Sequence, residues 1–225
     1  MPILREFDLD IPYVKSSGDK EDYEKNWKQQ RREFRDEIRC VASLFECHFE
    51  KFKTEKCWKL LVECVERIVD ERVIGEDICI VQVELNIERY FQLSNIEKKK
   101  LILKLLKNGI EKIIDEKGWN KQLFESAYQQ VIDCNYINER IWKQPKKSPN
   151  RKHIAEVFCE HDIDKFEISI IVKNNEGEVV KREKLITERP NEWAFTKHFG
   201  KLKWISSNEV TLVNKNESKQ WIVQI

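Results

Sequence analysis

Two eight-residue stretches of the sequence carry acidic side chains at the same spacing. They are FECHFEKF, residues 45–52, and VELNIERY, residues 83–90, and they match in kind position by position. In a β-strand, alternate side chains point to the same face. If the two stretches are neighbouring strands, one sheet face gathers four carboxylates, an imidazole and an amide. These residues are Glu46, His48, Glu50, Glu84, Asn86 and Glu88.

Such a face has more than one chemical interpretation. It can bind a divalent cation or hold a general acid and base, but it is also the polar outer face that an exposed sheet requires. Neither stretch contains an aspartate, and nothing nearby supplies a nucleophile. We therefore expect a protein-binding surface, with no catalytic residues and no bound metal. Its residues are Glu46, His48, Glu50, Glu84 and Glu88.

Two other functions fit the same sequence. The first is a carboxylate- and metal-dependent hydrolase that uses Glu46, Glu50, Glu84 and Glu88. The second is a structural adaptor that docks through the C-terminal part of the chain. A catalytic pair must converge in a concavity, whereas a partner surface can be flat.

The other chemically active residues form no site motif. Cys159 and His161 amount to half a zinc site, and no second ligand pair has matching spacing. The six glycines form no phosphate-binding loop. Three tryptophans of the C-terminal part suit the core of a small β domain better than a stacking platform; they are Trp193, Trp204 and Trp221. We expect no cofactor and no nucleic-acid partner.

The second acidic stretch lies in the clearest strand-to-helix joint of the chain. Residues 78–91 alternate apolar and polar side chains, which predicts a strand. Ser94 and Glu97 form a capping box at the start of a helix that ends at Gly118. The apolar stripe of this helix is Ile102, Leu105, Leu106, Ile110 and Ile113. A second helix follows, with its inward residues at Leu123, Phe124, Ala127, Tyr128, Val131 and Ile132.

The first acidic stretch fits two periodicities. Phe45, Cys47 and Phe49 alternate with polar residues as in a strand, but the apolar residues between Ile38 and Phe52 also fit a helical stripe. The clearer second copy favours a strand here. Thr54 then caps a helix over 58–69. A further helix is expected over 20–36, with Tyr23, Trp27 and Phe34 on one side.

The second half of the chain is rich in strands. KQPKKSPNRK, residues 143–152, is typical of a solvated linker. Five candidate strands follow with turn residues between them, at 154–160, 165–173, 178–187, 209–214 and 220–225. Sequential strands with short turns predict an antiparallel meander. We predict an α+β fold with a mixed α/β domain of two strand-helix units over 1–142, the linker 143–152, and an antiparallel β domain over 153–225.

Composition restricts the class of protein. Lys and Arg number 41 and Asp and Glu 40, so the net charge of +1 attracts neither nucleic acid nor an acidic membrane. No stretch approaches the length of a membrane span, and the first 20 residues lack the apolar core of a signal peptide. Seven cysteines without CxxC spacing indicate free thiols. We expect a cytoplasmic protein.

In general build the chain resembles the immunity proteins that Firmicutes encode beside polymorphic toxins. The resemblance lies in the abundance of Lys, Glu and Ile, in the strand-to-helix joint VELNIERYFQLSNIEKKK, and in the tail GKLKWISSNEVTLVNKNESKQWIVQI. It implies a non-enzymatic protein that binds one cognate toxin and blocks it. Immunity proteins against nucleases are often acidic, whereas this chain is balanced in charge.

Overall fold

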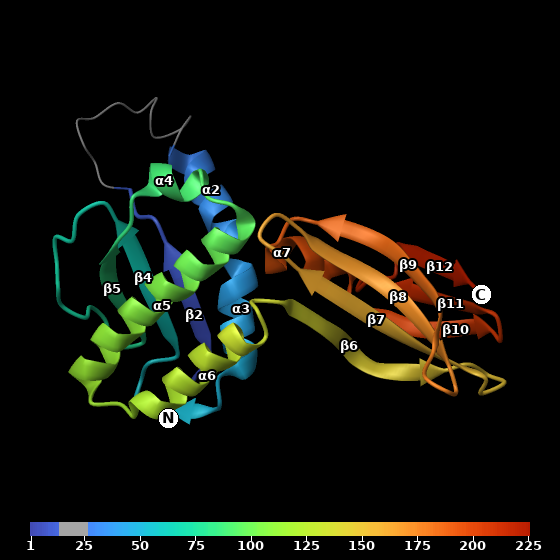
Figure 1. Cartoon of the computed structure of the whole chain (residues 1–225). Coiled ribbons are helices and arrows are strands. Elements are labelled where there is room, and N and C mark those ends of the chain that lie inside the picture. Colours follow the sequence, from blue (N-terminus) through green and yellow to red (C-terminus); the bar gives the residue numbers. More distant parts are fainter. Residues whose placement is uncertain (14–26) are drawn as a thin grey trace. The chain divides into compact units, whose positions relative to one another are not determined.

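The computed structural model describes residues 1–13 and 27–225. The chain forms two compact units, Met1–Ile137 and Asn138–Ile225. Figure 1 shows helices with a sheet in the first unit and mainly strands in the second. The fold is α+β, as the sequence predicts, with a parallel sheet in the first unit and antiparallel sheets in the second.

Three parallel strands form the main sheet of the first unit. They are β2 (Glu6–Asp10), β4 (Lys59–Val65) and β5 (Ile78–Glu84). Their order is β2-β4-β5, so β4 is central and β2 lies at an edge. Two short strands, β1 (Ile3–Leu4) and β3 (Phe52–Lys53), form an antiparallel pair.

The helices of the first unit are α2 (Lys28–Glu37), α3 (Arg39–His48), α4 (Ile87–Phe91), α5 (Asn95–Lys117) and α6 (Lys121–Asp133). The capping box of Ser94 and Glu97 opens α5, and Gly118 ends it in the left-handed conformation, so both signals are confirmed. The helix predicted over 20–36 overlaps α2, but its residues 20–26, which include Tyr23, lie outside the described residues.

Helix α5 lies across β4 and β5 (Figure 1). The predicted stripe from Ile102 to Ile113 is buried, and Leu106 is fully so. The helix comes close to the sheet at Gly109, where a Cβ atom would lie 2.3 Å from Cγ2 of Val62. Glycine therefore sets how near α5 comes to the central strand.

The predicted repeat is wrong. Residues 39–48 form α3, so the first acidic stretch is the end of a helix and not a strand. The helical stripe prevails because it buries Val41 and Phe45, and the Phe45 ring packs edge-on against Phe7 with centroids 4.9 Å apart. The likeness of residues 45–52 and 83–90 is chance.

The helix predicted over 58–69 is also wrong. Most of that range is strand β4, in which Leu60, Val62 and Cys64 are buried alternately. Parallel pairing with β2 and β5 supplies hydrogen bonds along both edges of β4, and this outweighs the helical spacing of its apolar residues. Thr54 caps no helix; its hydroxyl donates to the carbonyl oxygen of Cys57 at 2.5 Å.

The second unit contains a four-stranded antiparallel meander and a small three-stranded sheet. The meander is β6 (Asn138–Lys147), β7 (His153–His161), β8 (Phe166–Asn174) and β9 (Val179–Glu188). The small sheet is β10 (Lys201–Ser206), β11 (Glu209–Val213) and β12 (Gln220–Gln224). Between them lie α7 (Glu192–Phe195) and the 3-10 helix η2 (Thr196–His198). All five predicted strands are present, whereas β6 and β10 were not predicted.

The segment 143–152, predicted to be a linker, belongs to the second unit. Residues 143–147 end strand β6, and the following turn leads directly into β7. Pro145 is tolerated because β6 is an edge strand and its pairing with β7 is irregular between Trp142 and Lys146. The indole of Trp204 donates to the carbonyl oxygen of Lys146 at 2.8 Å, which anchors this end of the strand.

Apolar residues of both sheets form one core in the second unit, with Trp204 and Trp221 packed against it. Trp193 is different, because it lies on α7 and is 91% exposed. The three tryptophans therefore form no common platform. Within residues 1–13 and 27–225, no helix has the length and apolar character needed to cross a membrane.

Candidate functional site

The five residues predicted to bind a partner do not share one face. Glu46 and His48 lie in the last turns of α3, and Glu50 is exposed in the loop that follows. Glu88 lies on α4. Glu84 alone belongs to a sheet strand, at the end of β5. The carboxylate cluster proposed for a hydrolase is therefore not formed by these side chains.

The sheet of the first unit does have a polar face, but most of the residues on it differ from the predicted ones. Along β4 the residues Leu60, Val62 and Cys64 are buried under the helices, whereas Lys59, Leu61 and Glu63 stay partly exposed. Strand β5 repeats this alternation. We call the sheet face that carries this second set the open face; Asp8 shares this face on β2 but is itself buried. The open face consists of Glu6, Asp8 and Asp10 on β2, Lys59, Leu61 and Glu63 on β4, and Ile78, Ile80, Gln82 and Glu84 on β5.

The strand register sorts the open face into rows. Asp8, Leu61 and Ile80 lie side by side in the middle row. The row toward the strand starts is Glu6, Lys59 and Ile78, and the row toward the strand ends is Asp10, Glu63 and Gln82. Apolar side chains thus occupy the middle of β4 and the first half of β5, with carboxylates around them.

Lysine 59 neutralises two of these carboxylates. Its Nζ lies 2.8 Å from Oδ2 of Asp8 and 2.6 Å from Oε1 of Glu6. Burial opposes the charged form of Lys59, but the hydrogen bonds to Asp8 and Glu6 outweigh it and raise the pKa of the lysine. Asp8 is only 6% exposed, and a buried carboxylate needs such a partner. The pair fixes β2 against β4.

Glu46 protects the outer edge of β2. Its Oε1 accepts the backbone N–H of Phe7 at 3.0 Å, and its Oε2 pairs with Nη2 of Arg39 at 3.0 Å. Arg39 in turn donates to the carbonyl oxygen of Phe7 at 3.2 Å. An unprotected strand edge is a template for association with other chains. The role of Glu46 is therefore structural, which the sequence alone did not reveal.

Acidic groups at the carboxyl ends of the strands are held differently. Asp10 receives Nε of Arg31 at 2.8 Å and a second, very short bond from Nη2 of the same guanidinium. Gln82 places its amide nitrogen 3.4 Å from Oε2 of Glu63, and its carbonyl oxygen accepts the backbone N–H of Val69 at 3.0 Å. Within the described residues, Glu63 and Glu84 have no ion-pair partner.

A groove of about 780 Å³ lies at the other end of the sheet. It contains two of the predicted residues, Glu46 and Glu50, beside the aromatic rings of Phe49 and Trp58. The guanidinium of Arg5 stands 5.7 Å above the ring of Trp58. The groove is wide and is bordered by the first residues of the chain. This groove is a second candidate for contact with a partner, after the open face.

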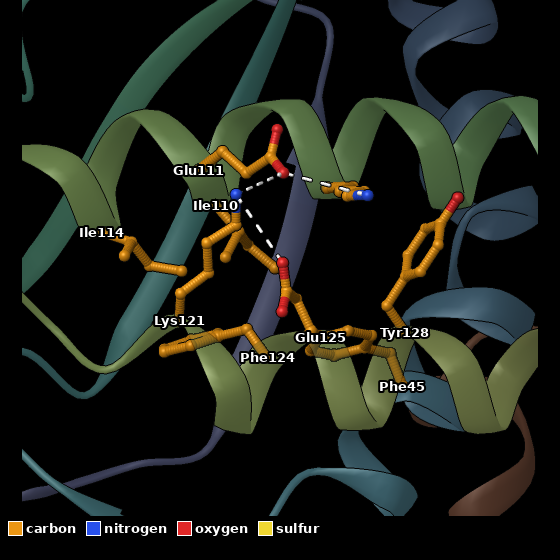
Figure 2. A pocket seen from close by; sticks show the side chains of 9 residues that line it. Phe45, Ile110, Glu111, Ile114, Lys121, Phe124, Glu125 and Tyr128 are labelled. Carbon is orange, nitrogen blue, oxygen red and sulfur yellow. Dashed lines mark ion pairs between the residues drawn. The ribbon is translucent and has the colours of Figure 1, made fainter.

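Between α5 and α6 lies a narrow cavity of about 20 Å³ (Figure 2). Phe45, Ile110, Ile114 and Phe124 line it, and Lys121 closes its mouth by pairing with carboxylates of both helices. This volume holds about one water molecule. The cavity lies at the contact between two helices and is too small for a substrate.

The described residues contain no group of three or more His, Cys, Asp or Glu side chains placed to hold a metal ion. Cys159 and His161, which the sequence leaves as half a zinc site without a second ligand pair, are structural residues at the end of β7. Cys159 is in the core, and the buried ring of His161 hydrogen-bonds through Nε2 to the carbonyl oxygen of Pro190 at 3.0 Å.

Sequence reasoning missed the first strand of the open face. The segment EFDLD alternates acidic and apolar side chains, and this period-two pattern was visible. None of the protein-family models, curated proteins or solved structures compared with this chain matches it.

Proposed function

We propose that this chain is a non-enzymatic protein that binds another protein through the open face. One observation supports this above all, the alternation of buried and partly exposed residues from Lys59 to Cys64 on β4 and along β5. Parallel sheets usually bury both faces and then have apolar strands throughout. A parallel sheet that keeps a polar face with Leu61, Ile78 and Ile80 on it is suited to being covered by another molecule.

Strand geometry gives the size of the contact. Three strands about 4.8 Å apart, with five to seven residues at about 3.3 Å each, present roughly 15 by 20 Å, or about 300 Å². A stable interface buries about 800 Å² on each partner. The open face therefore supplies the centre of the contact, and surrounding loops supply the rest.

Charge predicts the chemistry of the partner. Lys59 and Arg31 already neutralise Glu6, Asp8 and Asp10. Glu63 and Glu84 lack such cations among the residues described, and both flank the apolar middle. The partner we propose brings an apolar side chain to Leu61 and Ile80 and basic side chains to the two glutamates. Opposite charges at the rim of an interface steer encounter and fix orientation.

Such a protein fits the class of cytoplasmic immunity proteins, to which the sequence has a general resemblance. An immunity protein must bind its toxin tightly and needs no chemistry of its own. The experiment that tests this uses the protein encoded beside the gene for this chain. We expect its expression to stop the growth of a bacterial host and co-expression of this chain to restore growth.

Variants of the open face make the test specific. Leu61→Arg and Glu63→Lys are expected to weaken binding in calorimetry by about tenfold or more, about 1.4 kcal/mol each, as at interface hot spots. Ile141→Arg and Glu139→Lys are matched controls, because both residues are exposed on strand β6 of the second unit. The control variants should bind and protect as the unmodified chain does.

Several outcomes overturn the proposal. If the neighbouring protein is harmless, or if the unmodified chain does not restore growth, the immunity function is wrong. If Leu61→Arg and Glu63→Lys protect fully while remaining folded, the open face is not the contact. Stoichiometric binding of magnesium or manganese, lost in Glu63→Gln, would instead favour a carboxylate-dependent hydrolase.

A further inference from the structure

Two cysteine thiols meet where β4 and β5 begin. The backbone N–H of Trp58 donates to the carbonyl oxygen of Asp77 at 2.9 Å, which brings the residues before each strand together. The thiol of Cys57 lies within hydrogen-bonding reach of both the thiol and the backbone N–H of Cys79. Both cysteines are free thiols in this structure.

We propose that Cys57 and Cys79 form a redox modification site that oxidises reversibly to an intramolecular disulfide. The co-reactant is a peroxide or a small disulfide. This site is separate from the proposed partner surface, because both cysteine side chains are buried and lie outside the open face.

The chemistry balances for either oxidant. With hydrogen peroxide, the Cys57 thiolate attacks one oxygen, the O–O bond breaks, and hydroxide leaves a sulfenic acid on Cys57. The Cys79 sulfur then attacks the Cys57 sulfur, the S–O bond breaks, and water leaves with the thiol proton. Two thiols lose two electrons, and the peroxide is reduced to two molecules of water.

Local electrostatics select Cys57 as the first nucleophile. The hydrogen bond from the Cys79 thiol lowers the pKa of Cys57 to about 7, against the effect of burial, and the Cys79 backbone N–H and the Lys117 charge add to this. A thiolate is therefore abundant at neutral pH. The same contact raises the pKa of Cys79, which suits the thiol that attacks second.

Access to the pair is through a surface loop. Cys57 is 3% exposed and Cys79 is 0% exposed. The sulfur of Cys79 lies 3.9 Å from the carbonyl oxygens of Gly75 and Glu76, which are themselves exposed residues. Local opening of such a loop costs less than global unfolding. A small oxidant then reaches the sulfurs while the sheet stays intact.

Other cysteines of the chain provide internal controls. Burial raises the pKa of Cys159 to about 12 and also raises that of Cys64, so both should be unreactive. Cys47 is exposed on α3 and reports simple accessibility. A specific dithiol must form its disulfide faster than Cys47 is modified.

The experiment treats the whole folded chain with hydrogen peroxide or oxidised glutathione near neutral pH. Remaining thiols are alkylated under denaturing conditions, and the digest is analysed by mass spectrometry. We expect a peptide cross-linked through Cys57 and Cys79, the loss of two hydrogen atoms per chain, and full reversal by dithiothreitol. Its rate of formation should rise as the pH passes through about 7 and then level off.

Variants identify the order of attack. Cys79→Ser should leave Cys57 as a mixed disulfide with glutathione, Cys57→Ser should abolish both products, and Cys47→Ser should change nothing. Three results overturn the proposal: no cross-link when Cys47 is already oxidised, a cross-link to another cysteine, or equal reactivity of Cys57 and Cys64. The unmodified chain decides these points even if a serine variant fails to fold.

Discussion

Substitution of Gly109 by alanine tests the packing that supports the open face. Gly109 lies in the middle of α5, where the helix crosses the central strand. A Cβ atom built there lies 2.3 Å from Cγ2, 3.0 Å from Cγ1 and 3.2 Å from Cβ of Val62. Rotation of the valine cannot relieve all three contacts, because its Cβ is fixed to the strand.

Two opposing effects set the magnitude. Alanine improves the intrinsic helix propensity by about 1 kcal/mol relative to glycine. Overpacking of a dense core costs about 1–3 kcal/mol. We therefore expect Gly109→Ala to lower the free energy of unfolding of the first unit by up to about 2 kcal/mol. Asn108→Ala is the matched control. Asn108 is next to Gly109 but exposed, so alanine there improves helix propensity without a clash.

The effect of Gly109→Ala on stability should change sign when Val62 is also replaced by alanine. Val62→Ala removes two buried methyl groups and should cost about 2–3 kcal/mol. In that variant Gly109→Ala is expected to stabilise by about 1 kcal/mol, because the new methyl group enters the space that the valine vacates. Urea titration followed by far-ultraviolet circular dichroism measures this, since most of the helical residues lie in the first unit.

If Gly109→Ala stabilises the unmodified chain as much as Asn108→Ala does, α5 is not pressed against β4 and the reasoning is wrong. If both backgrounds respond alike, the contact with Val62 is not what requires glycine.

Three further predictions concern stability. Leu106→Ala should cost about 2–5 kcal/mol in urea titration, because Leu106 is fully buried; a loss below about 1 kcal/mol would contradict this. Lys98→Met should cost about 3–5 kcal/mol by leaving Glu37, its partner at 2.6 Å, buried without a counter-charge, and Glu37→Leu should restore much of the loss in the same assay. The Lys184 hydrogen bond lowers the pKa of Glu167 against burial, so its stabilisation is present above the usual glutamate pKa and lost as pH falls below it; the difference in melting temperature between the chain and Glu167→Gln should therefore shrink on acidification.

Local patterns determined much of this fold from the sequence. The strand predicted over 78–91 is present as β5, although it ends at Glu84 and residues 87–91 form α4 instead. This strand and the helix after Ser94 were predicted because strand alternation, the capping box and the Gly118 stop act within a few residues of one another. The meander strands β7, β8 and β9 followed for the same reason, since alternation and turn residues are short-range signals. The class, α+β, depended on these elements alone.

Tertiary structure decided what the local patterns left open. Residues 39–48 and 59–65 each fit both a helix and a strand. The first became α3 because Phe45 packs on Phe7, and the second became β4 because strands β2 and β5 bond to both its edges. Those partners lie far away in the sequence. The candidate site moved with them. Glu84 lies beside Val65, one row beyond Glu63, whereas Glu46 seals the edge of β2. A sheet face is defined by the register between strands, and that register is set by packing of distant segments, which no pattern within one segment records.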